Sequence, residues 1–449
     1  MFYGPMKPHL GHLYRRPNFL HFSQRLIRIS PQFGHRNFVA SAPGGIGLPQ
    51  LVHVSSLSTV LSVILIPRCE FVSCQTPLYL VCFVVGNTVS QVYYCTCTLI
   101  FHGVVLGVNL RGIVQKRSTK LKDLGGKSIA IDAYNALYQF LAIIRQPDGT
   151  PLKDRTGKVT SHLSGLLYRT SNLVEMGIKP IYVFDGVPPA LKEVEIKRRR
   201  KAKEEALIRY EKALKEGRIK EARTFAQATS RLKDYMAEDS KRLLNLMGIP
   251  WVQAPSEGEA QAAHIVKRGD ADYCASQDYD SLLFGAPRLL RNVTISGRRK
   301  LPRKNIYIEV IPEIVELEQV LTECGITYEQ LVDIGMLIGT DFNPEGVKGL
   351  GPKTALRMIR EFGNLENALP HLKNAEFPVE PQRIREIFLH PKVTNNYRIE
   401  WRELDVQGVI DFICIQRDFS EDRVRKTLDK MQKGAERLKG KTTLERWFQ

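Results

Sequence analysis

Most of the chain alternates short apolar runs with longer amphipathic segments. The runs 128–132 (SIAID), 180–185 (PIYVFD) and 271–276 (ADYCAS) are short and contain many β-branched and aromatic residues, which predicts buried strands. Segments 133–145 and 161–177 carry apolar residues at helical spacing and predict helices. This order of strand, helix and strand predicts a parallel sheet with right-handed crossovers. The predicted fold class is therefore α/β.

Carboxylates follow several of these apolar runs. Asp132 and Asp185 close two of the predicted strands, and Asp341 closes a further hydrophobic segment. Asp278 and Asp280 come after the third strand at a spacing of two, so in an extended chain both side chains point to one face. Open parallel sheets bind ligands outside the carboxyl ends of their strands. We therefore expect these carboxylates to meet at one edge of the sheet.

Two glutamates precede the third predicted strand. In segment 255–259 (PSEGE), Ser256 is a suitable helix N-cap and Glu259 completes a capping box. Capping alone would explain Glu259 but not Glu257. A turn-capping role is an equally good explanation for one of the two aspartates that follow the strand.

Seven carboxylates gathered at one site would need cations. Neighbouring like charges repel by roughly 4 kcal/mol per pair at an effective dielectric of about 20. Oxygen ligands without nearby His or Cys suit Mg²⁺ or Mn²⁺, and a divided set of carboxylates suits two ions about 3.5 to 4 Å apart. The sequence thus predicts a two-metal site.

Two basic segments accompany the acidic residues. Most of the long polar region 188–248 is typical of solvated helices with Glu–Lys pairs. The five consecutive cations 197–201 within it repel one another unless an anion is near, so we expect them to steer phosphates. Segment 291–304 has six basic residues and no acidic one, which predicts a mobile basic loop or hairpin. An ordinary surface loop is the alternative.

Segment 341–356 (DFNPEGVKGLGPKTAL) is rich in glycine. A P-loop requires Gly directly before Lys, and here Pro352 separates Gly351 from Lys353. The better match is a helix-hairpin-helix type turn, in which Gly349 and Gly351 let the backbone approach a strand and a helix N-terminus presents amides to its phosphates. Such a turn grips duplex backbone without reading sequence.

The net charge of +18 favours a polyanionic partner, although charge alone does not separate DNA, RNA and acidic membrane. Residues 1–105 hold one acidic residue, seven Lys or Arg, and five of the eight cysteines. The rest of the chain has 58 basic and 46 acidic residues, so the basic excess belongs to it too. Its cysteines, Cys274, Cys324 and Cys414, are scattered in apolar settings and indicate a reducing compartment.

Residues 1–105 show no clear periodicity. The apolar runs 51–67 and 77–106 are interrupted by polar residues and are marginal for spanning a membrane. The Arg- and Ser-containing, acid-poor start is typical of a transit peptide, but the segment is far longer than such peptides need to be. Its cysteines lack the paired spacing of a zinc site. We expect this segment to lie outside the functional protein, with Leu106 as a natural start at a non-AUG codon.

The C-terminal segment from Gly434 to Gln449 ends in KGKTTLERWFQ after a Lys-rich helix. Leu444, Trp447 and Phe448 are apolar residues at a polar chain end, where they have no core to join. They predict a peptide that docks into a hydrophobic pocket of a partner.

Six motifs occur in one order: IAIDAYNALYQFL, TSHLSGLLYRT, YVFDGVPPALK, APSEGEAQAA, SQDYDSLLFG and GTDFNPEGVKGLGPKTA. With them the chain, over about residues 107–449, resembles the flap endonucleases, the structure-specific 5′ nucleases of DNA replication and repair, and most of all their archaeal branch. The resemblance implies a twisted, mainly parallel sheet flanked by helices, the PIN-like 5′ nuclease fold. It also implies a helical arch and a helix-hairpin-helix type DNA-binding motif.

The resemblance also implies a division of the chain into regions. These are an N-terminal extension (1–105), an N-terminal nuclease domain with the base of the arch (106–203), a linker within the arch (204–220), an internal nuclease domain with the helix-hairpin-helix type motif (221–363), a C-terminal helical region (364–440) and a sliding-clamp-binding tail (441–449).

Roles for individual residues follow from the same resemblance. Two Mg²⁺ ions, for which Mn²⁺ can substitute, would be held directly or through water by Asp132, Asp185, Glu257, Glu259, Asp278, Asp280 and Asp341. The catalytic cations at the base of the arch would be Lys192 and Arg199. DNA would be bound by Gly107, Tyr138, Arg145, Arg169, Gly349, Gly351 and Lys353, with Tyr138 stacking on a base. The clamp would be bound by Leu444, Trp447 and Phe448, although Lys441 stands where the clamp motif has Gln and one polar anchor is missing.

We therefore expect a structure-specific 5′ flap endonuclease with 5′–3′ exonuclease activity, which acts on branched duplex DNA. The expected protein is a monomer away from the clamp, has no membrane partner, and works in an archaeal cytoplasm with the nucleoid or in a eukaryotic nucleus. The alternatives are a related 5′ nuclease that prefers bubbles or gaps, and a non-catalytic DNA-binding scaffold that recruits the clamp. Seven retained carboxylates argue against the scaffold, because a scaffold gains nothing from their repulsion.

Overall fold

In the computed structural model the chain forms two compact units, Met1–Leu99 and Ile100–Gln449. The structure describes the backbone of four strands in the first unit, and residues 107–300, 307–372 and 375–445 in the second. The expectations about a leader and a start codon lie outside these described residues.

The first unit contains an antiparallel sheet with the strand order β1-β2-β3-β4. Its strands are β1 (Leu51–Val54), β2 (Leu61–Leu65), β3 (Tyr79–Val85) and β4 (Thr88–Tyr94). The pattern of this segment predicts no regular element. The strands nevertheless coincide with its runs of Val, Leu and Tyr, which favour extended backbone.

The second unit is built on a seven-stranded sheet with the order β5-β13-β10-β9-β6-β7-β8. The five strands from β10 to β8 are parallel, and β13 and β5 add an antiparallel edge. The strands are β5 (Arg117–Ser118), β6 (Ser128–Asp132), β7 (Lys179–Phe184), β8 (Trp251–Gln253), β9 (Tyr273–Ala275), β10 (Arg288–Arg291) and β13 (Glu313–Glu316). A separate hairpin pairs β11 (Gly297–Lys300) with β12 (Tyr307–Val310). The predicted α/β class with a mainly parallel sheet is confirmed.

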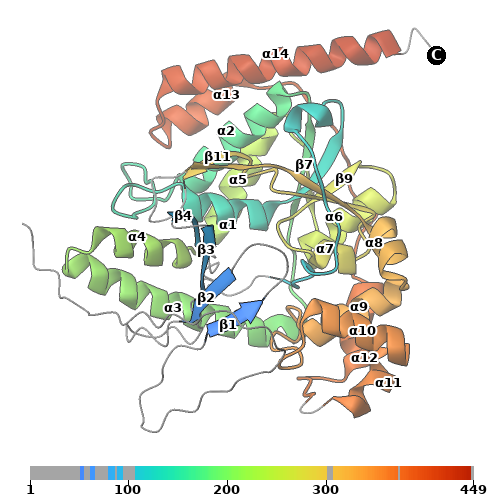
Figure 1. Cartoon of the computed structure of the whole chain (residues 1–449). Coiled ribbons are helices and arrows are strands. Elements are labelled where there is room, and N and C mark those ends of the chain that lie inside the picture. Colours follow the sequence, from blue (N-terminus) through green and yellow to red (C-terminus); the bar gives the residue numbers. More distant parts are fainter. Residues whose placement is uncertain are drawn as a thin grey trace, which may run out of the picture. The chain divides into compact units, whose positions relative to one another are not determined.

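Helices make up most of the remaining described chain (Figure 1). They are α1 (Ala133–Ile143), α2 (Ser161–Glu175), α3 (Glu193–Lys215), α4 (Ile219–Ala228), α5 (Asp234–Leu246), α6 (Gly258–Lys267), α7 (Asp280–Leu283), α8 (Leu317–Cys324), α9 (Tyr328–Ile338), α10 (Pro352–Phe362), α11 (Leu365–Ala368), α12 (Pro381–Leu389), α13 (Val406–Val409) and α14 (Glu421–Glu445). Short 3-10 turns lie at Leu121–Leu124, Ala190–Lys192 and Leu369–His371, and a π-helical turn lies at Ile410–Ile415.

Both faces of the sheet are covered, because successive strand residues point to opposite sides. In β6, Ile129 and Ile131 pack with α1, α2, α5 and α14, whereas Ala130 packs on the other face with α6, α7 and α9. In β7, Tyr182 takes the first face and Ile181 the second. Burial on both faces explains why these strands are nearly continuous apolar runs.

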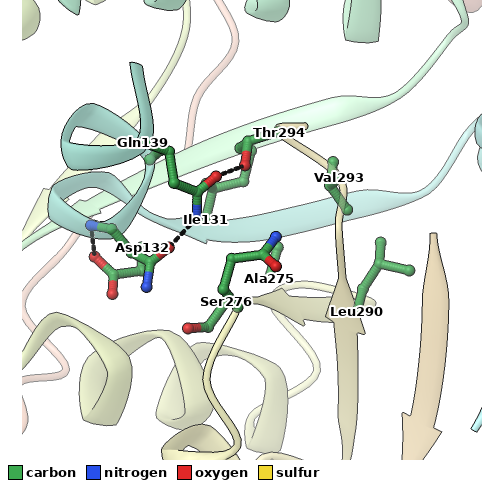
Figure 2. Close-up of a pocket in the computed structure, with 11 residues that line it drawn as sticks. Ile131, Asp132, Gln139, Ala275, Ser276, Leu290, Val293 and Thr294 are labelled. Atoms are coloured by element: carbon green, nitrogen blue, oxygen red, sulfur yellow. Dashed lines mark hydrogen bonds between the residues drawn. The ribbon is translucent and has the colours of Figure 1, made fainter. Parts of the chain in front are cut away.

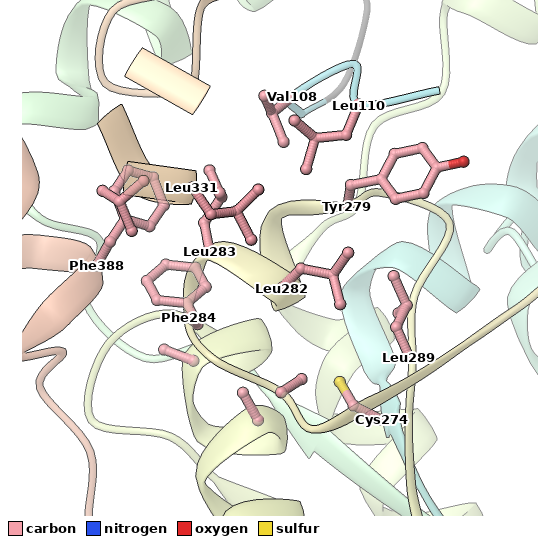
Figure 3. Packing of buried hydrophobic residues seen from close by; sticks show 14 of the residues in the cluster. Val108, Leu110, Cys274, Tyr279, Leu282, Leu283, Phe284, Leu289, Leu331 and Phe388 are labelled. Carbon is pink, nitrogen blue, oxygen red and sulfur yellow. The ribbon is translucent and has the colours of Figure 1, made fainter. Parts of the chain in front are cut away.

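The core on the face of the sheet that contains Ala130 and Ile181 joins the sheet to α7, α9 and α12 (Figure 3). Leu282, Leu283 and Phe284 from the α7 segment lie among Leu331 of α9 and Phe388 of α12. The rings of Phe284 and Phe388 are 5.0 Å apart between centroids. This packing fixes α7, and with it the Asp280 carboxylate at its first residue.

Helices α3 and α4 lie side by side (Figure 1). The buried alanines Ala206, Ala213, Ala222 and Ala226 allow the two helices to pack closely. Where the resemblance implies a linker at 204–220, α3 continues to Lys215 and α4 begins at Ile219. Alanine, glutamate and lysine are strong helix formers, and the short break contains Gly217 at a φ of +68°.

No helix in the part of the chain that the structure describes is long and apolar enough to cross a membrane.

Candidate active site

Strands β6 and β7 bring two carboxylates to one edge of the sheet. Asp132 is the last residue of β6, and its Oδ1 accepts a hydrogen bond from the amide of Asn135 at 3.0 Å. Asp185 follows β7, and its Oδ1 accepts from the amide of Gly258 at 2.6 Å. A Cβ atom at Gly258 would lie 2.6 Å from that same oxygen, so α6 approaches Asp185 this closely only with glycine.

The start of α6 differs from the prediction. The N-cap is Glu257 and not Ser256, whose hydroxyl donates to the carbonyl of Val187 at 3.1 Å. Glu259 accepts from the hydroxyl of Ser276 at 2.5 Å instead of closing a capping box. The capping-box prediction is wrong because these side chains find partners on neighbouring loops. Glu259 therefore faces the site and does not serve its own helix.

Asp278 and Asp280 converge through a turn and not along an extended strand, which corrects the expected local geometry. Asp280 is the first residue of α7, and the amide of Val108 donates to its Oδ1 at 2.8 Å. Gly107 has a φ of +78° and lies against both carboxylates. A Cβ atom there would lie 2.5 Å from Oδ2 of Asp280 and 2.8 Å from Cβ of Asp278. Gly107 therefore lies beside two of the predicted metal ligands, and its expected contact with DNA stays a prediction.

Asp341 reaches the site from a helix. The hydrophobic segment before it is the end of α9, after which Gly339 turns the chain at a φ of +114°. The hydroxyl of Thr340 donates to Oδ1 of Asn343 at 2.6 Å and closes the turn. Oδ2 of Asp341 lies 3.0 Å from Nζ of Lys192.

Two cations from the base of the arch lie among the carboxylates. Lys192 ends a 3-10 turn and pairs with Glu257 as well as with Asp341. Arg199, on α3, pairs with Asp341 through Nη2. Both side chains are largely buried, with 15% and 21% of their surface exposed. The structure thus brings the two predicted catalytic cations into direct contact with the predicted metal ligands.

Glu195 holds Arg199 in place and was not singled out from the sequence. Its carboxylate is 1% exposed and accepts from Nε of Arg199 at 2.7 Å and from Nε of Arg198 at 2.5 Å. The signal available in the sequence was its position three and four residues before two arginines on a helix. Glu195 therefore fixes the direction of the Arg199 side chain.

Four of the five cations 197–201 have acidic partners on their own helix. Besides the two arginines bound to Glu195, Lys197 pairs with Glu193 at 2.8 Å and Arg200 pairs with Glu204 at 3.2 Å. The glutamates of these i,i+4 pairs thus supply anions near the run without a phosphate. Phosphate steering by this run stays a prediction.

Burial raises the pKa of most of these carboxyl groups, and their mutual repulsion adds to it. Burial is the largest cause in each case; it raises the pKa of Asp132 to about 6, that of Asp280 to about 7 and that of Asp185 to about 8. The pKa values of Glu259 and Asp278 are raised well above their usual range by burial and by the neighbouring aspartates. Without further cations the site is short of positive charge.

Asp341 is the exception among the aspartates. Burial alone would raise its pKa, but Lys192 and Arg199 outweigh burial and lower it. Burial opposes the charge of Lys192 as well, and Asp341 and Glu257 together raise its pKa in spite of that. The charged forms of Asp341, Lys192 and Arg199 therefore stabilise one another.

The donor set fits divalent cations. Lys192 and Arg199 pair directly with Glu257 and Asp341, two of the seven predicted ligands, and the oxygen donors of the set suit Mg²⁺ or Mn²⁺. Within the described residues no group of three or more His, Cys, Asp or Glu side chains is arranged closely enough to hold one ion. In this arrangement Lys192 and Arg199 hold Glu257 and Asp341 instead. The role of the seven carboxylates as metal ligands stays a prediction.

Arg291 supports the loop that carries Asp278. A mobile basic loop or hairpin was predicted for 291–304, but Arg291 is the last residue of β10 and its side chain is only 7% exposed. It donates to the carbonyl of Gln277 at 2.9 and 3.0 Å, pairs with Glu313 at 3.1 Å, and lies 4.3 Å from the centre of the Tyr279 ring. A single arginine in a basic run gave no sign of this role.

The side chains expected to contact DNA have intramolecular partners. The ring of Tyr138 faces Nζ of Lys203 at 4.5 Å. Arg145 donates to the carbonyls of Leu141 and Gly149 at 2.8 Å and to the hydroxyl of Ser230 at 2.9 Å. Arg169 donates to the carbonyl of Ser296 at 3.1 Å. Arg145 and Arg169 thus anchor neighbouring segments, and their contacts with DNA stay predictions.

The helix-hairpin-helix type turn presents open backbone. Gly349 has a φ of +82°, and Gly351 is the N-cap of α10, whose first residue is Pro352. A Cβ atom at Gly349 or Gly351 would meet nothing within 4 Å, and Lys353 is exposed. This arrangement leaves room for a phosphate backbone beside the helix N-terminus.

The predicted clamp-binding residues lie at the limit of the described chain. Helix α14 ends at Glu445, so only the backbone of Leu444 is described. Trp447 and Phe448 lie outside the described residues. The clamp prediction is therefore untested by the structure.

Family models match the same part of the chain that carries the carboxylates. The model described as the XPG N-terminal domain matches residues 107–206, and the model described as the XPG I-region matches residues 248–341.

Two archaeal proteins show how extensive the similarity is. Flap endonuclease 1 of Staphylothermus marinus is 52% identical over 349 residues, which are 76% of this chain and 100% of that protein. Flap endonuclease 1 of Hyperthermus butylicus is 56% identical over 331 residues, which are 73% of this chain and 95% of that protein. The similarity therefore spans whole relatives.

Solved structures give the same picture. Flap endonuclease-1 from Methanococcus jannaschii is 43% identical with a TM-score of 0.58, and the match covers 74% of this chain and 99% of that one. The catalytic core of Rad2 in complex with DNA substrate is 24% identical with a TM-score of 0.52, and the match covers 70% and 96% of the two chains. The likeness to Rad2 shows the fold alone.

Proposed function

This chain belongs to the flap endonuclease family of XPG-type nucleases, and we propose that it cuts 5′-flap DNA at the junction with two Mg²⁺ ions. It is a structure-specific 5′ nuclease, a metal-dependent hydrolase that binds DNA and acts in replication and repair. Its proposed activities include 5′–3′ exonuclease cleavage. The identity of the metal, the number of ions and the roles of single residues are proposals.

The seven carboxylates would hold the two ions directly or through water. When bound, Mg²⁺ lowers the pKa of a coordinated water and neutralises charge on the phosphate. Mn²⁺ can substitute because it accepts the same oxygen ligands. The raised pKa values of Asp132, Asp185 and Asp280 support this proposal, since each marks a carboxylate whose charge the protein leaves uncompensated.

Lys192 and Arg199 would stabilise the phosphate during cleavage. Once Glu257 and Asp341 are neutralised, the ammonium and guanidinium groups can turn their donors toward the nonbridging oxygens of the phosphodiester. Glu195 would keep Arg199 pointed at the site during this exchange of partners. The two cations would thereby balance the negative charge of Glu257 and Asp341 in the free enzyme and that of the phosphate in the complex with DNA.

The remaining proposed contacts place the DNA. A base near the cut would stack on Tyr138 after displacing the Lys203 ammonium from the ring face. Gly349, Gly351 and Lys353 would hold the duplex backbone.

The C-terminal tail would dock on the sliding clamp, with Leu444, Trp447 and Phe448 as anchors and Lys441 weakening the contact. Away from the clamp the enzyme would act as a monomer. Its place of work would follow its substrate, the nucleoid of an archaeal cytoplasm or a eukaryotic nucleus.

The observation that carries the proposal is the gathering of strand-end, helix-end and turn carboxylates around Lys192 and Arg199. We would test it with the full chain on a 5′-flap duplex, mapping products to single nucleotides in Mg²⁺ and in EDTA. Asp280→Asn should bind DNA within about twofold of wild type and cut about a hundredfold or more slowly. Asp429→Asn, at an exposed position on α14, is the matched control and should cut normally.

The outcomes separate the possibilities. A Mg²⁺-dependent cut at the flap junction supports the proposal. Cleavage in EDTA would overturn metal dependence, and Asp280→Asn cutting at the wild-type rate would remove Asp280 from the site. DNA binding by the wild type without any cleavage would favour a scaffold instead.

A further inference from the structure

A series of hydrogen bonds joins the base of the β11–β12 hairpin to the carboxylate site. Figure 2 shows its first bond, between Thr294 and Gln139. The hydroxyl of Thr294 donates to Oε1 of Gln139 at 2.6 Å, and Nε2 of Gln139 donates to Oδ1 of Asn135. Nδ2 of Asn135 then donates to Oδ2 of Asp278 at 3.0 Å. Gln139 and Asn135 are one turn apart on α1, so the helix holds them in register.

The direction of this chain follows from its acidic end. A carboxylate that binds a cation can only accept hydrogen bonds, so the Asn135 amide must turn its nitrogen toward Asp278. Its oxygen then accepts from the Gln139 nitrogen, and the Gln139 oxygen needs a donor in turn. Thr294 supplies that donor through its hydroxyl. Each side chain has one orientation that satisfies the whole chain.

The same helix positions a second carboxylate. The backbone amide of Asn135 donates to Oδ1 of Asp132 while its side chain donates to Asp278. One residue therefore sets the relative placement of two predicted metal ligands that come from different strands. The cavity beside the chain, lined by Ile131, Ala275 and Leu290 among others, has a volume of about 10 Å³. That space is too small for more than one water, so solvent cannot freely replace a lost partner.

Thr294, at the other end of this series of hydrogen bonds, lies in a segment that several further hydrogen bonds hold in place. Thr294 is 7% exposed and follows Asn292, whose left-handed backbone (φ +66°) turns the chain after β10. The side chain of Asn292 donates to the carbonyl of Ile311 at 3.2 Å, and the hydroxyl of Ser296 donates to the carbonyl of Val293 at 3.1 Å. Arg169 donates to the carbonyl of Ser296.

We propose that Asn135 and Gln139 are positioning residues for Asp278, and that Thr294 completes them, so that the base of the hairpin sets the orientation of this carboxylate. The inference rests on the proposed role of Asp278 as a metal ligand. A polar partner of this kind orients a ligand side chain and strengthens ion binding, and its loss costs about 10- to 100-fold in affinity or rate.

The test measures ion binding directly, by calorimetric titration of the full chain with Mn²⁺, together with kcat and KM on a 5′-flap duplex. Gln139→Met keeps the volume and removes both bonds, and should weaken Mn²⁺ binding and lower kcat about tenfold or more. Thr294→Val removes only the terminal donor and should cost about fivefold in each. The KM for DNA should stay within about twofold, because these residues contact the carboxylate and not the duplex.

Two controls separate hydrogen bonding from packing. Thr294→Ser keeps the hydroxyl and should recover wild-type binding within about twofold, whereas Thr294→Val should not. Ser296→Ala removes a hydroxyl from the same segment that takes no part in the hydrogen bonds between Thr294 and Asp278. This variant should behave as wild type. In the Gln139→Met background, Thr294→Val should add no further loss, because the two residues act through one connection.

Asp278→Asn is measured in parallel to distinguish the two proposals. If it loses Mn²⁺ binding while Gln139→Met and Thr294→Val keep it, the positioning role is overturned and the metal site stands. If Asp278→Asn itself binds Mn²⁺ as wild type does, the proposed ligand role fails first. Equal losses in Thr294→Ser and Thr294→Val, or a comparable loss in Ser296→Ala, would assign the effect to packing and overturn the inference.

Discussion

Nζ of Lys192 lies 3.0 Å from Oδ2 of Asp341, in an ion pair where both side chains are about 85% buried. The two residues come from the base of the arch and from the turn after α9. The pair keeps the Asp341 carboxylate ionised where burial raises the pKa of the other aspartates. An arch residue therefore compensates the site before substrate arrives.

Replacing this lysine should impair chemistry more than binding. Lys192→Met removes a donor aimed at the site, and we expect kcat on a 5′-flap duplex to fall about 100- to 1000-fold. DNA affinity should change only a few-fold, because Lys192 is buried among carboxylates. Lys212→Met, at an exposed position on α3 outside the basic run 197–201, is the control and should cut normally. Equal rates for the Lys192→Met variant and the wild type would exclude a catalytic role for this residue.

Gly107 and Gly126 allow a matched comparison of backbone strain and collision. Both have positive φ, +78° and +88°, but only a Cβ at Gly107 meets carboxylate atoms of Asp280 and Asp278. Gly126→Ala should cost about 1–2 kcal/mol of stability and leave cleavage intact. Gly107→Ala should lose a similar amount of stability to backbone strain. It should also reduce kcat about tenfold or more, because the added Cβ displaces Asp280. Stability is measured by urea unfolding, and equal kcat values for the two variants would contradict the displacement.

His162 should make stability fall in mild acid. Burial lowers its pKa from 6.5 to about 3, with nearby Arg417 as a second cause. Both ring nitrogens lack a hydrogen-bond partner among the described residues, and the ring contacts Tyr235 edge-on at 6.3 Å between centroids. Between pH 6.5 and 3 the unfolded chain binds a proton here that the folded protein does not. Stability is therefore lost as the pH falls, by about 1.4 kcal/mol per pH unit.

The measurement is the free energy of unfolding of wild type and His162→Leu from pH 7.5 to 5 in metal-free buffer. The free energy of unfolding of the wild type minus that of His162→Leu should be constant above about pH 7. At pH 5 this difference should be lower by about 2 kcal/mol, because only the wild type loses stability through His162. Parallel profiles would show that His162 takes up its proton without unfolding.

Arg385 should be worth more to stability than its surface neighbours. It donates to Oδ1 of Asp333 at 2.7 and 2.9 Å, and Asp333 is 3% exposed and also accepts from the amide of Leu365 at 3.0 Å. Arg385→Met leaves this carboxylate buried without its cation, which costs about 3–5 kcal/mol. Arg383→Met, at an exposed position on the same helix, should change stability by less than about 0.5 kcal/mol. Equal unfolding midpoints for the two variants would contradict the prediction.

The sequence by itself determined the elements whose signals are local. The apolar runs that end at Asp132 and Asp185 are strands because both faces of a parallel sheet are buried, and their carboxylates must then lie at one edge. The positions of α1 and α2 follow from helical spacing. The glycine-rich segment 341–356 was predicted to form a helix-hairpin-helix type turn because Pro352 excludes a P-loop, and α10 does begin at Pro352.

Tertiary structure alone decided which partner each polar side chain takes, because that choice depends on groups far away in sequence. Ser256 was predicted to cap a helix but donates to the carbonyl of Val187. Arg291 was predicted to lie in a basic loop or hairpin but is buried and donates to the carbonyl of Gln277. Asn135 and Gln139 are polar residues of a kind common in helices. The sequence around them does not indicate that they contact Asp278 and Thr294. A buried polar group without a hydrogen-bond partner costs free energy of folding, so these side chains pair with groups that the fold brings close. The local sequence pattern does not predict such pairs, because the partners lie far away in sequence.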